Sequence, residues 1–243
     1  MRNKLMKLSG KTVLAGTLLL ILPIAHAAEG PFELSANVAL TSDYVWRGYT
    51  QTDEGWATQG GFDIKHETGI YVGTWGSNVK FLEDNTVKPE DRADLELDLY
   101  LGYAGDLDYG LSYDVKAIRY MYPGAGSDLN YDFTEFDISV GYALPQGTEL
   151  GFSYDYSPEF FGKTDTAHHY VFNVGHTLPN GLGLGAYIGR QYLKDSKDYT
   201  YYGASVSFSI ADFDASVSYS DTNLDNVKDV ADSRVFFTLS KSF

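Results

Sequence analysis

The fold is decided by the last eleven residues of the chain, Ser233-Arg234-Val235-Phe236-Phe237-Thr238-Leu239-Ser240-Lys241-Ser242-Phe243. Apolar residues at positions 235, 237, 239 and 243 share one side of a period-two pattern that only Lys241 interrupts. This pattern predicts a β-strand with one apolar face. A transmembrane barrel needs such a final strand, because it pairs with the first strand and leaves no open edge in lipid. On these residues alone, an edge strand of a soluble sheet is the alternative.

Residues 1–27 have the organisation of a cleaved secretory signal peptide. Their first part is basic, residues 13–24 are apolar, and Ala25-His26-Ala27 is a small-x-small cleavage site. The apolar part is too short for a spanning helix. The remaining residues, 28–243, suit a single domain. The sequence therefore predicts an exported protein.

Composition excludes several classes of function. The chain has no cysteine, so neither disulfides nor thiolate metal sites are expected. The signal carries four of the 18 basic residues and none of the 33 acidic ones, which leaves a net charge of −19 for residues 28–243. Such an acidic chain is a poor partner for nucleic acid. No cofactor is indicated.

Alternating apolar and polar residues predict about twelve strands, the first of them over residues 32–48. The clearest has Leu95, Leu97, Leu99, Leu101 and Tyr103 on one face. Mostly longer polar connections, at 49–55, 82–92, 123–130, 157–166, 194–198 and 221–232, alternate with tight turns at 67–69, 105–108, 145–147, 179–181 and 211–212. Long loops at one end, tight turns at the other and an even strand number are typical of outer-membrane barrels. We therefore predict an all-β, antiparallel, up-and-down transmembrane β-barrel.

Three segments resemble a known family: Thr41-Ser42-Asp43-Tyr44-Val45-Trp46-Arg47-Gly48-Tyr49-Thr50-Gln51-Thr52, Gln59-Gly60-Gly61-Phe62-Asp63 and Gly69-Ile70-Tyr71-Val72-Gly73-Thr74-Trp75-Gly76-Ser77-Asn78-Val79. They are similar to the TorF family of proposed porins, formerly a conserved bacterial family of unknown function. The likeness covers most of residues 28–243 and is sharpest over residues 41–81. It implies an outer-membrane barrel with a transport role. No functional residues are carried over from the family.

The C-terminal strand also resembles that of bacterial outer-membrane proteins, which commonly end on Phe. The resemblance implies that Phe237, Leu239 and Phe243 form an assembly signal read by the barrel-insertion machinery. Lys241 departs from the usual apolar residue at its position, but it lies close enough to the strand end to snorkel.

Aromatic residues near the predicted strand ends are expected to form interfacial girdles rather than ligand-stacking platforms. These candidates are Tyr44, Trp46, Tyr103, Tyr142, Tyr154, Tyr156 and Tyr219. The face that carries Leu, Val, Ile and Phe is expected to contact outer-membrane lipid and lipopolysaccharide.

The opposite face is polar, rich in small residues, and predicted to line the lumen. Alternation places eleven acidic residues there: Glu33, Asp43, Asp63, Asp94, Glu96, Asp98, Asp114, Asp137, Glu149, Asp155 and Asp214. It places four basic residues there: Arg47, Lys65, Lys116 and Arg234. An acidic pore favours cations, and the row Asp94, Glu96 and Asp98 is the best candidate for selectivity. The alternative is that the charges pair and fill a closed lumen.

Catalytic and metal sites have little support in the sequence. His168-His169 is the sole histidine pair, and its members point to opposite faces of a strand, one expected in the girdle and one in the lumen. No catalytic motif accompanies them. Acidic residues 83–84 and 90–91 could hold Ca²⁺, but a solvated loop explains them as well. We predict no catalytic residue and no metal ligand.

The sequence thus predicts a porin-like channel in the outer membrane of a Gram-negative bacterium. It would pass small hydrophilic solutes by diffusion, with a preference for cations, and an oligomer is left open. The rival functions are a non-conducting structural barrel and a lipid-active outer-membrane enzyme. A soluble periplasmic β protein is disfavoured, because the apolar rows would expose too much surface.

Overall fold

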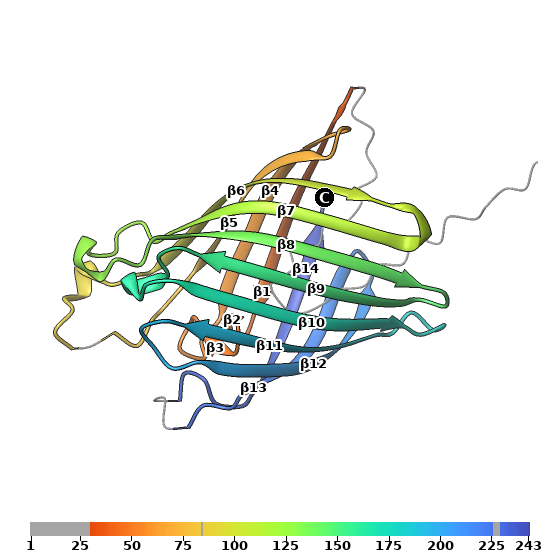
Figure 1. The fold of residues 1–243 in the computed structure, drawn as a ribbon. Helices are drawn as coiled ribbons and strands as arrows, with labels where there is room; N and C mark the ends of the chain where they lie inside the picture. The colour runs from red at the N-terminus through yellow and green to blue at the C-terminus, as the bar shows by residue number, and fades with distance from the viewer. Residues whose placement is uncertain (1–29, 84, 226–228) are drawn as a thin grey trace, which may run out of the picture.

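The computed structural model describes residues 30–83, 85–225 and 229–243; the predicted signal peptide, 1–27, lies outside them. Twelve strands of the described residues form one closed antiparallel barrel, and β2 pairs with β3 in a separate hairpin (Figure 1). The barrel strands are β1 (Phe32–Thr41), β4 (Ala57–His66), β5 (Ile70–Asn78), β6 (Leu95–Asp106), β7 (Leu111–Met121), β8 (Phe133–Leu144), β9 (Thr148–Ser157), β10 (Ala167–Thr177), β11 (Gly183–Leu193), β12 (Tyr199–Ile210), β13 (Phe213–Thr222) and β14 (Arg234–Ser242). The predicted fold class is confirmed.

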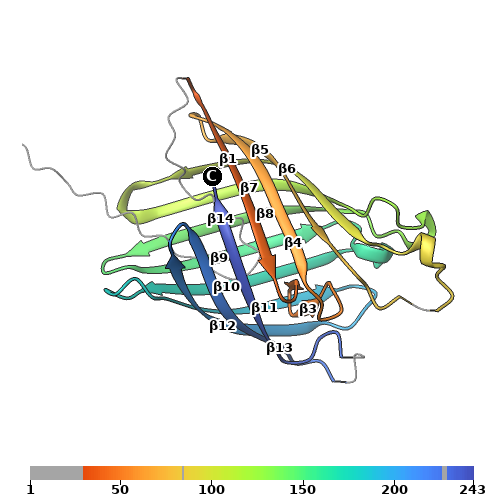
Figure 2. The same ribbon diagram turned by 180° about the vertical axis from the view of Figure 1, so that it is seen from behind.

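The last strand closes the barrel against the first, as Figure 2 shows where β14 and β1 run side by side. Their register runs from Asn37 opposite Ser242 to Thr41 opposite Thr238. The terminal residue takes part, because the Phe243 N–H donates to the Ala36 carbonyl over 2.8 Å. Within the described residues, each strand of the ring pairs with two neighbours.

Apolar side chains cover the outside of the barrel and polar ones face inward. Leu99, Leu101 and Ile138 are about half exposed, whereas Ser153 and Ser218 are buried inside. The outer face also has a hollow of about 860 Å³, lined mainly by apolar residues of β5 to β9. An apolar exterior around a polar interior suits a barrel surrounded by lipid. No helix among the described residues is long and apolar enough to cross a membrane.

The strand connections alternate in length, as expected. Turns such as 67–69 and 145–147 join strands at one end, and longer segments with the 3₁₀ turns η1 (Pro89–Asp91), η3 (Ser127–Leu129) and η4 (Phe161–Lys163) lie at the other (Figure 1). A further 3₁₀ turn, η2 (Asp108–Gly110), belongs to the short-turn end.

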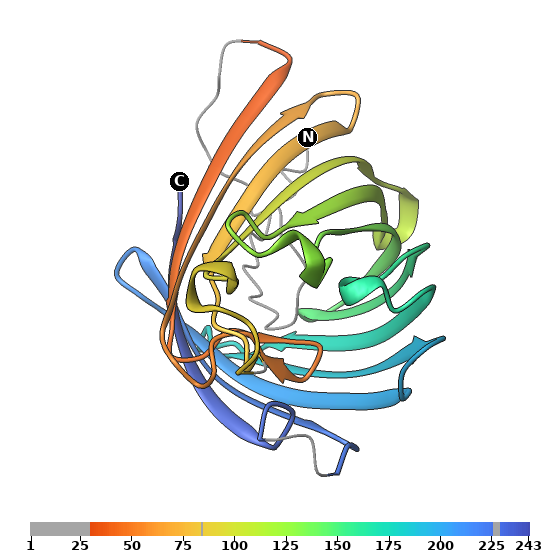
Figure 3. The same cartoon turned by 90° about the vertical axis from the view of Figure 1, so that its left-hand side faces the viewer.

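The expectation that the first strand continues to residue 48 is wrong. β1 ends at Thr41, and residues 42–56, here called the inward segment, turn into the barrel. This segment contains β2 (Val45–Trp46) and β3 (Tyr49–Thr50), and Figure 3 shows the hairpin inside the ring of strands. The Thr41 hydroxyl donates to the Asp43 carbonyl over 2.8 Å, and the Asp43 carboxylate accepts hydrogen bonds from Thr50 and Thr52. These local bonds compete with strand pairing and bend the chain inward.

Candidate functional site

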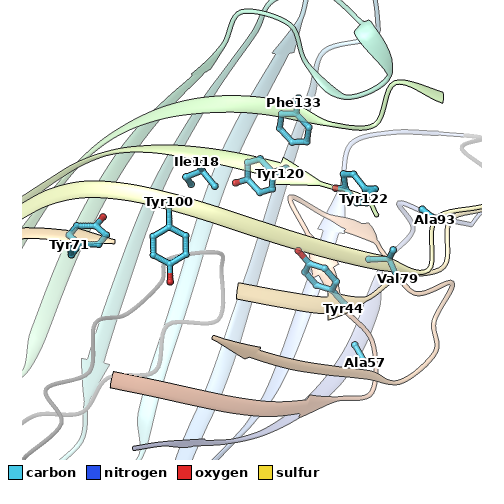
Figure 4. Packing of buried hydrophobic residues seen from close by; sticks show 10 residues of the cluster. All are labelled: Tyr44, Ala57, Tyr71, Val79, Ala93, Tyr100, Ile118, Tyr120, Tyr122 and Phe133. Atoms are coloured by element: carbon cyan, nitrogen blue, oxygen red, sulfur yellow. The ribbon is translucent and has the colours of Figure 1, made fainter. Parts of the chain in front are cut away.

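The inward segment contacts opposite walls of the barrel. The Tyr44 hydroxyl donates to Glu96 of β6 over 2.9 Å, and Figure 4 shows this ring among the buried residues of β6 to β8. On the other side, the Tyr49 ring packs edge-on against Tyr199 of β12, with centroids 5.2 Å apart. Because Tyr44 is 7% exposed, the segment fills lumen space rather than lying across the mouth in solvent. The lumen is therefore constricted at the long-loop end.

Arg47, at the tip of the β2–β3 hairpin, is the strongest anchor of this segment. Its two terminal nitrogens donate to the two carboxylate oxygens of Glu135 on β8, each over 2.9 Å. One also donates to Gln191 Oε1 on β11 over 3.1 Å, and the other lies 3.6 Å from Asp155 on β9. The Trp46 ring covers the guanidinium at 4.3 Å. One side chain thus joins the segment to three strands.

Arg47 keeps its positive charge in this buried setting. Burial by itself lowers the pKa of an arginine, but the neighbouring Glu135 and Asp155 carboxylates raise the pKa of Arg47 above its usual value. A buried ion pair with bidentate geometry is costly to break, because either partner left alone is an uncompensated charge.

The wall behind Arg47 continues as a hydrogen-bonded chain. Asp155 Oδ2 lies 2.6 Å from Nδ1 of His169 on β10, and Nε2 of His169 lies 2.7 Å from the Tyr201 hydroxyl on β12. An ionised carboxylate can only accept, so Nδ1 of His169 donates to Asp155, and Nε2 shares the second hydrogen bond with the Tyr201 hydroxyl. The prediction that one histidine of the pair faces the lumen is confirmed; His168 lies on the outer face against Tyr154 and Tyr156.

A second ion pair ties the inward segment to the closing strand. Arg234, the first residue of β14, lies 3.2 Å from the carboxylate of Asp43, and both side chains are 7% exposed. Arg234 also donates to the Asp229 carbonyl over 2.8 Å. The second residue after β1 and the first residue of β14 are thereby joined inside the barrel.

The predicted acidic row of β6 is divided by the structure. Glu96 and Asp98 are buried inside, whereas Asp94 is exposed before the strand begins. Glu96 accepts hydrogen bonds from the Tyr44 and Tyr122 hydroxyls, and Asp98 Oδ1 has no hydrogen-bond partner among the described residues. Neither buried carboxylate has an ion-pair partner in the part of the chain that the structure describes.

Four other predicted lumen residues have partners toward the short-turn end. Asp63 accepts from the Tyr100 hydroxyl over 2.6 Å, and Asp114 accepts from Tyr71 over 2.7 Å; both rings are visible in Figure 4. Lys116 and Asp137 lie 3.2 Å apart, nitrogen to oxygen. Lys65 is half-buried on β4, opposite Tyr71 in the register. Beside these polar groups, the interior holds a cluster of buried aromatic and apolar side chains that includes Ile118, Tyr120 and Phe133 (Figure 4).

Two of the expected girdle residues are not on the outer surface. Tyr44 is buried on Glu96, and the Trp46 ring stacks on Phe160 at 6.1 Å inside the barrel, because the inward segment carries both residues away from the wall. The other five lie on the outer face of their strands: Tyr103, Tyr142 and Tyr219 are exposed, and Tyr154 and Tyr156 are half-buried. Their role at a membrane interface stays a prediction.

The candidate assembly residues lie on the outer face of β14. Phe237 and Phe243 are exposed, and Leu239 is half-buried. Lys241 lies over the Phe213 and Phe243 rings at 5.3 and 5.4 Å. Recognition of these residues by insertion machinery stays a prediction.

Chemically, the lumen is an acidic passage. Among the described residues, six acidic side chains are buried: Asp43, Glu96, Asp98, Glu135, Asp137 and Asp155. Their basic counterparts inside are Arg47, Arg234 and Lys116. No group of three or more His, Asp or Glu residues in the described ranges is placed to hold a metal ion.

The sequence profile of a bacterial family, described as "Bacterial protein of unknown function (Gcw_chp)", matches residues 25–243. The chain belongs to this family. The family resemblance seen in the sequence is confirmed to that extent, and the name TorF stays a prediction. No curated protein matches the sequence.

Solved porins share the fold of this Gcw_chp member. The structure is similar to "KdgM porin", with a TM-score of 0.58, 6% identity, and coverage of 86% of this chain and 98% of that one. It is also similar to the NanC porin, with a TM-score of 0.54, 9% identity and the same coverage. Identities this low show a common barrel architecture.

Sequence reasoning missed three features of the site: the inward segment, Glu135 and Gln191. Alternation with Asp137, which was expected in the lumen, places Glu135 on the same inner face and could have identified it. Gln191 gave no signal, because a single amide in a strand is common. The inward segment was hidden by Tyr44 and Trp46, which continue the period-two pattern of β1.

Proposed function

We propose that this protein is an outer-membrane channel of a Gram-negative bacterium that passes small hydrophilic solutes by passive diffusion. The observation that carries the proposal is the closed barrel with an apolar exterior, a charged interior and the inward segment as its constriction. Arg47 holds the inward segment to the opposite wall. The segment thereby narrows the lumen and leaves polar side chains along it. Diffusion through such a passage needs no energy input and no catalytic residue. The proposal therefore includes neither energy coupling nor catalysis.

Similarity to porins supports this function. A second solved structure with the same fold is "KdgM porin in complex with disordered oligogalacturonate", at a TM-score of 0.58 and 7% identity, and that solute is a hydrophilic polyanion. Buried acids outnumber bases by six to three in the lumen of this chain, so we expect it to disfavour polyanions. Small neutral or cationic solutes fit the charge better.

The proposal extends to cation preference. Of the six buried acidic side chains in the described residues, Glu96 and Asp98 have no ion-pair partner, and Glu96 contacts the inward segment through Tyr44. Ionised carboxylates at a narrow point raise the local concentration of cations.

The proposed setting follows from the same features. Export by the signal peptide 1–27, location in the outer membrane, and insertion by the barrel-assembly machinery are expected for such a barrel. Lipid and lipopolysaccharide would cover the apolar exterior.

The test is single-channel conductance of refolded protein in a planar bilayer, with the reversal potential under a KCl gradient. We expect discrete current steps and a cation-selective potential. Asp98→Asn together with Glu96→Gln should reduce the ratio of cation to anion permeability by about two-fold or more, because two ionisable carboxyl groups are removed from the constriction. Asp94→Asn is the matched control, since Asp94 is exposed outside the strand, and it should change the ratio little.

A non-conducting structural barrel is the second candidate, and the buried Arg47–Glu135 pair favours it, because a tightly held segment can close a lumen. A folded barrel that gives no current steps, in the wild type and after release of the segment, would replace the channel with this candidate. Anion selectivity would keep the channel and overturn the electrostatic argument.

A further inference from the structure

The groups that hold Arg47 belong to the barrel wall and form a binding site in their own right. Glu135 offers both carboxylate oxygens to the two terminal nitrogens over 2.9 Å, and Gln191 Oε1 accepts from one of them over 3.1 Å. Asp155 adds a second negative charge at 3.6 Å. Such a bidentate set of acceptors matches the paired N–H donors of a guanidinium group and not a simple point charge.

Burial makes this site selective. Glu135 and Gln191 are each 1% exposed, and Asp155 is 8% exposed. Charged groups taken out of water this far are stable only with a well-fitted partner. An empty site would therefore attract a guanidinium from solution.

Arg47 fills the site at a backbone cost. Its φ of 49° lies in the left-handed region, which costs free energy for a residue other than glycine, and the following Gly48 has a φ of 86°. A Cβ at Gly48 would come within 2.5 Å of Thr222 Cγ2 and 2.9 Å of Tyr201 Cβ, so the turn is also pressed against the wall. A free guanidinium compound carries none of this strain and can compete with the tethered group.

The wall also has one hydrogen-bond donor that does not bind Arg47. Gln191 Nε2 is buried and has no hydrogen-bond partner among the described residues. It lies on the same amide whose oxygen contacts Arg47, so a ligand with an acceptor next to its guanidinium could make one bond more than Arg47 does.

We propose that Glu135, Asp155 and Gln191 form a guanidinium-binding site of the lumen, which Arg47 occupies in this structure and which a solute bearing a guanidinium group occupies when the inward segment withdraws. The assignment to a transported solute rests on the proposed channel function, because the solute must reach the lumen. The site itself does not depend on conductance.

The test is chemical rescue of Arg47→Ala with methylguanidinium. The midpoint of thermal unfolding is measured in detergent micelles with millimolar methylguanidinium chloride or methylammonium chloride. We expect methylguanidinium to raise the midpoint of Arg47→Ala in a saturable way, because a ligand that binds only the folded state stabilises it. The wild type, whose site is filled, should not respond. Methylammonium has the positive charge but lacks the paired N–H donors of a guanidinium group, so it should raise the midpoint much less.

Arg119→Ala is the matched control. Arg119 forms an ion pair with Asp132 on the outer face of the barrel, where both side chains are 47% exposed. Its loss leaves no buried site, so methylguanidinium should not rescue this variant. The triple variant Arg47→Ala, Glu135→Gln, Asp155→Asn should lose the response as well.

Folded Arg47→Ala that shows no saturable rescue, or rescue of Arg119→Ala to the same extent, would overturn the proposal. Refolding that succeeds only with methylguanidinium would support it. Should Arg47→Ala refold under neither condition, Arg47→Gln is measured in the same way, and reversible block of the Arg47→Gln current by methylguanidinium but not methylammonium gives a second readout. Rescue without any current would leave the binding site standing and the channel function refuted.

Discussion

At the scale of single residues, the lumen is organised by a few buried ion pairs. Arg47 with Glu135 and Arg234 with Asp43 join the inward segment to opposite parts of the wall. These pairs fix the position of the inward segment more than they stabilise the fold, because the free-energy cost of desolvating two charges offsets much of their attraction. Removal of one partner of a pair is destabilising, since the charge of the other partner stays buried.

We therefore expect Glu135→Gln to lower the free energy of unfolding by about 3–5 kcal/mol, as is typical when a buried pair loses one partner. Glu90→Gln, in an exposed loop, is the control and should change it by less than about 0.5 kcal/mol. Denaturant titration in lipid vesicles measures both.

The double variant Arg47→Ala, Glu135→Gln completes the cycle. It should be less destabilised than the sum of the single variants, because it removes both charges of the Arg47–Glu135 pair together. Additive effects would contradict a direct pairing of the two side chains.

At the scale of elements, the inward segment is the part that distinguishes this barrel from an open tube. Its β2–β3 hairpin has only two residues per strand, so it is too short to be stable without tertiary contacts. Tyr44, Arg47 and Tyr49 supply those contacts on three sides. The barrel strands, in contrast, each pair with two neighbouring strands of the wall.

Replacement of residues 44–50 by glycine and serine should therefore leave the barrel folded and increase the single-channel conductance by about two-fold or more, as the constriction is removed. Planar-bilayer recording gives the conductance, and circular dichroism confirms the strand content. An equally long replacement at 85–91, a largely exposed loop that contains η1, is the control and should leave conductance unchanged. Equal conductance in the two variants would show that the constriction lies elsewhere.

At the scale of the whole molecule, closure is the property on which everything else depends. The ring is completed by β14 against β1 over a short register that ends at the chain terminus. In lipid an unpaired edge leaves backbone groups without partners, each at a cost of about several kcal/mol. The C-terminal residues are thus a structural requirement, and we predict that they are also an assembly signal.

Deletion of Phe243 should reduce the yield of folded protein in the outer membrane several-fold, because it removes both the terminal backbone bonds to Ala36 and the exposed ring. Phe243→Ala, which keeps the backbone bonds, separates the two effects: a similar loss would point to recognition of the ring. Ser242→Ala is the control. Heat-dependent gel mobility of membrane fractions measures the folded yield.

The amino-acid sequence by itself determined the architecture of this protein. Alternation in segments such as Leu95–Leu101, loop lengths that differ at the two ends, and the terminal Phe243 all report local constraints that a lipid-facing strand must satisfy. Alternation also placed Glu96, Asp98, Asp137, Asp155 and Arg234 on the inner face, because side chains in a strand point to opposite sides in turn.

Only the tertiary structure decided how these residues meet. Arg47 lies 88 residues from Glu135 and 144 from Gln191 in the chain, and their contact depends on a segment that leaves the wall. Periodicity describes one strand against its own neighbours and contains no information on a loop that folds across the lumen. Tyr44 and Trp46 follow the pattern of β1 and yet lie inside, because the bend at Thr41 to Asp43 is stabilised by contacts with distant strands. Local sequence patterns thus predict the wall of the barrel, whereas its constriction depends on contacts between residues that are far apart in the sequence.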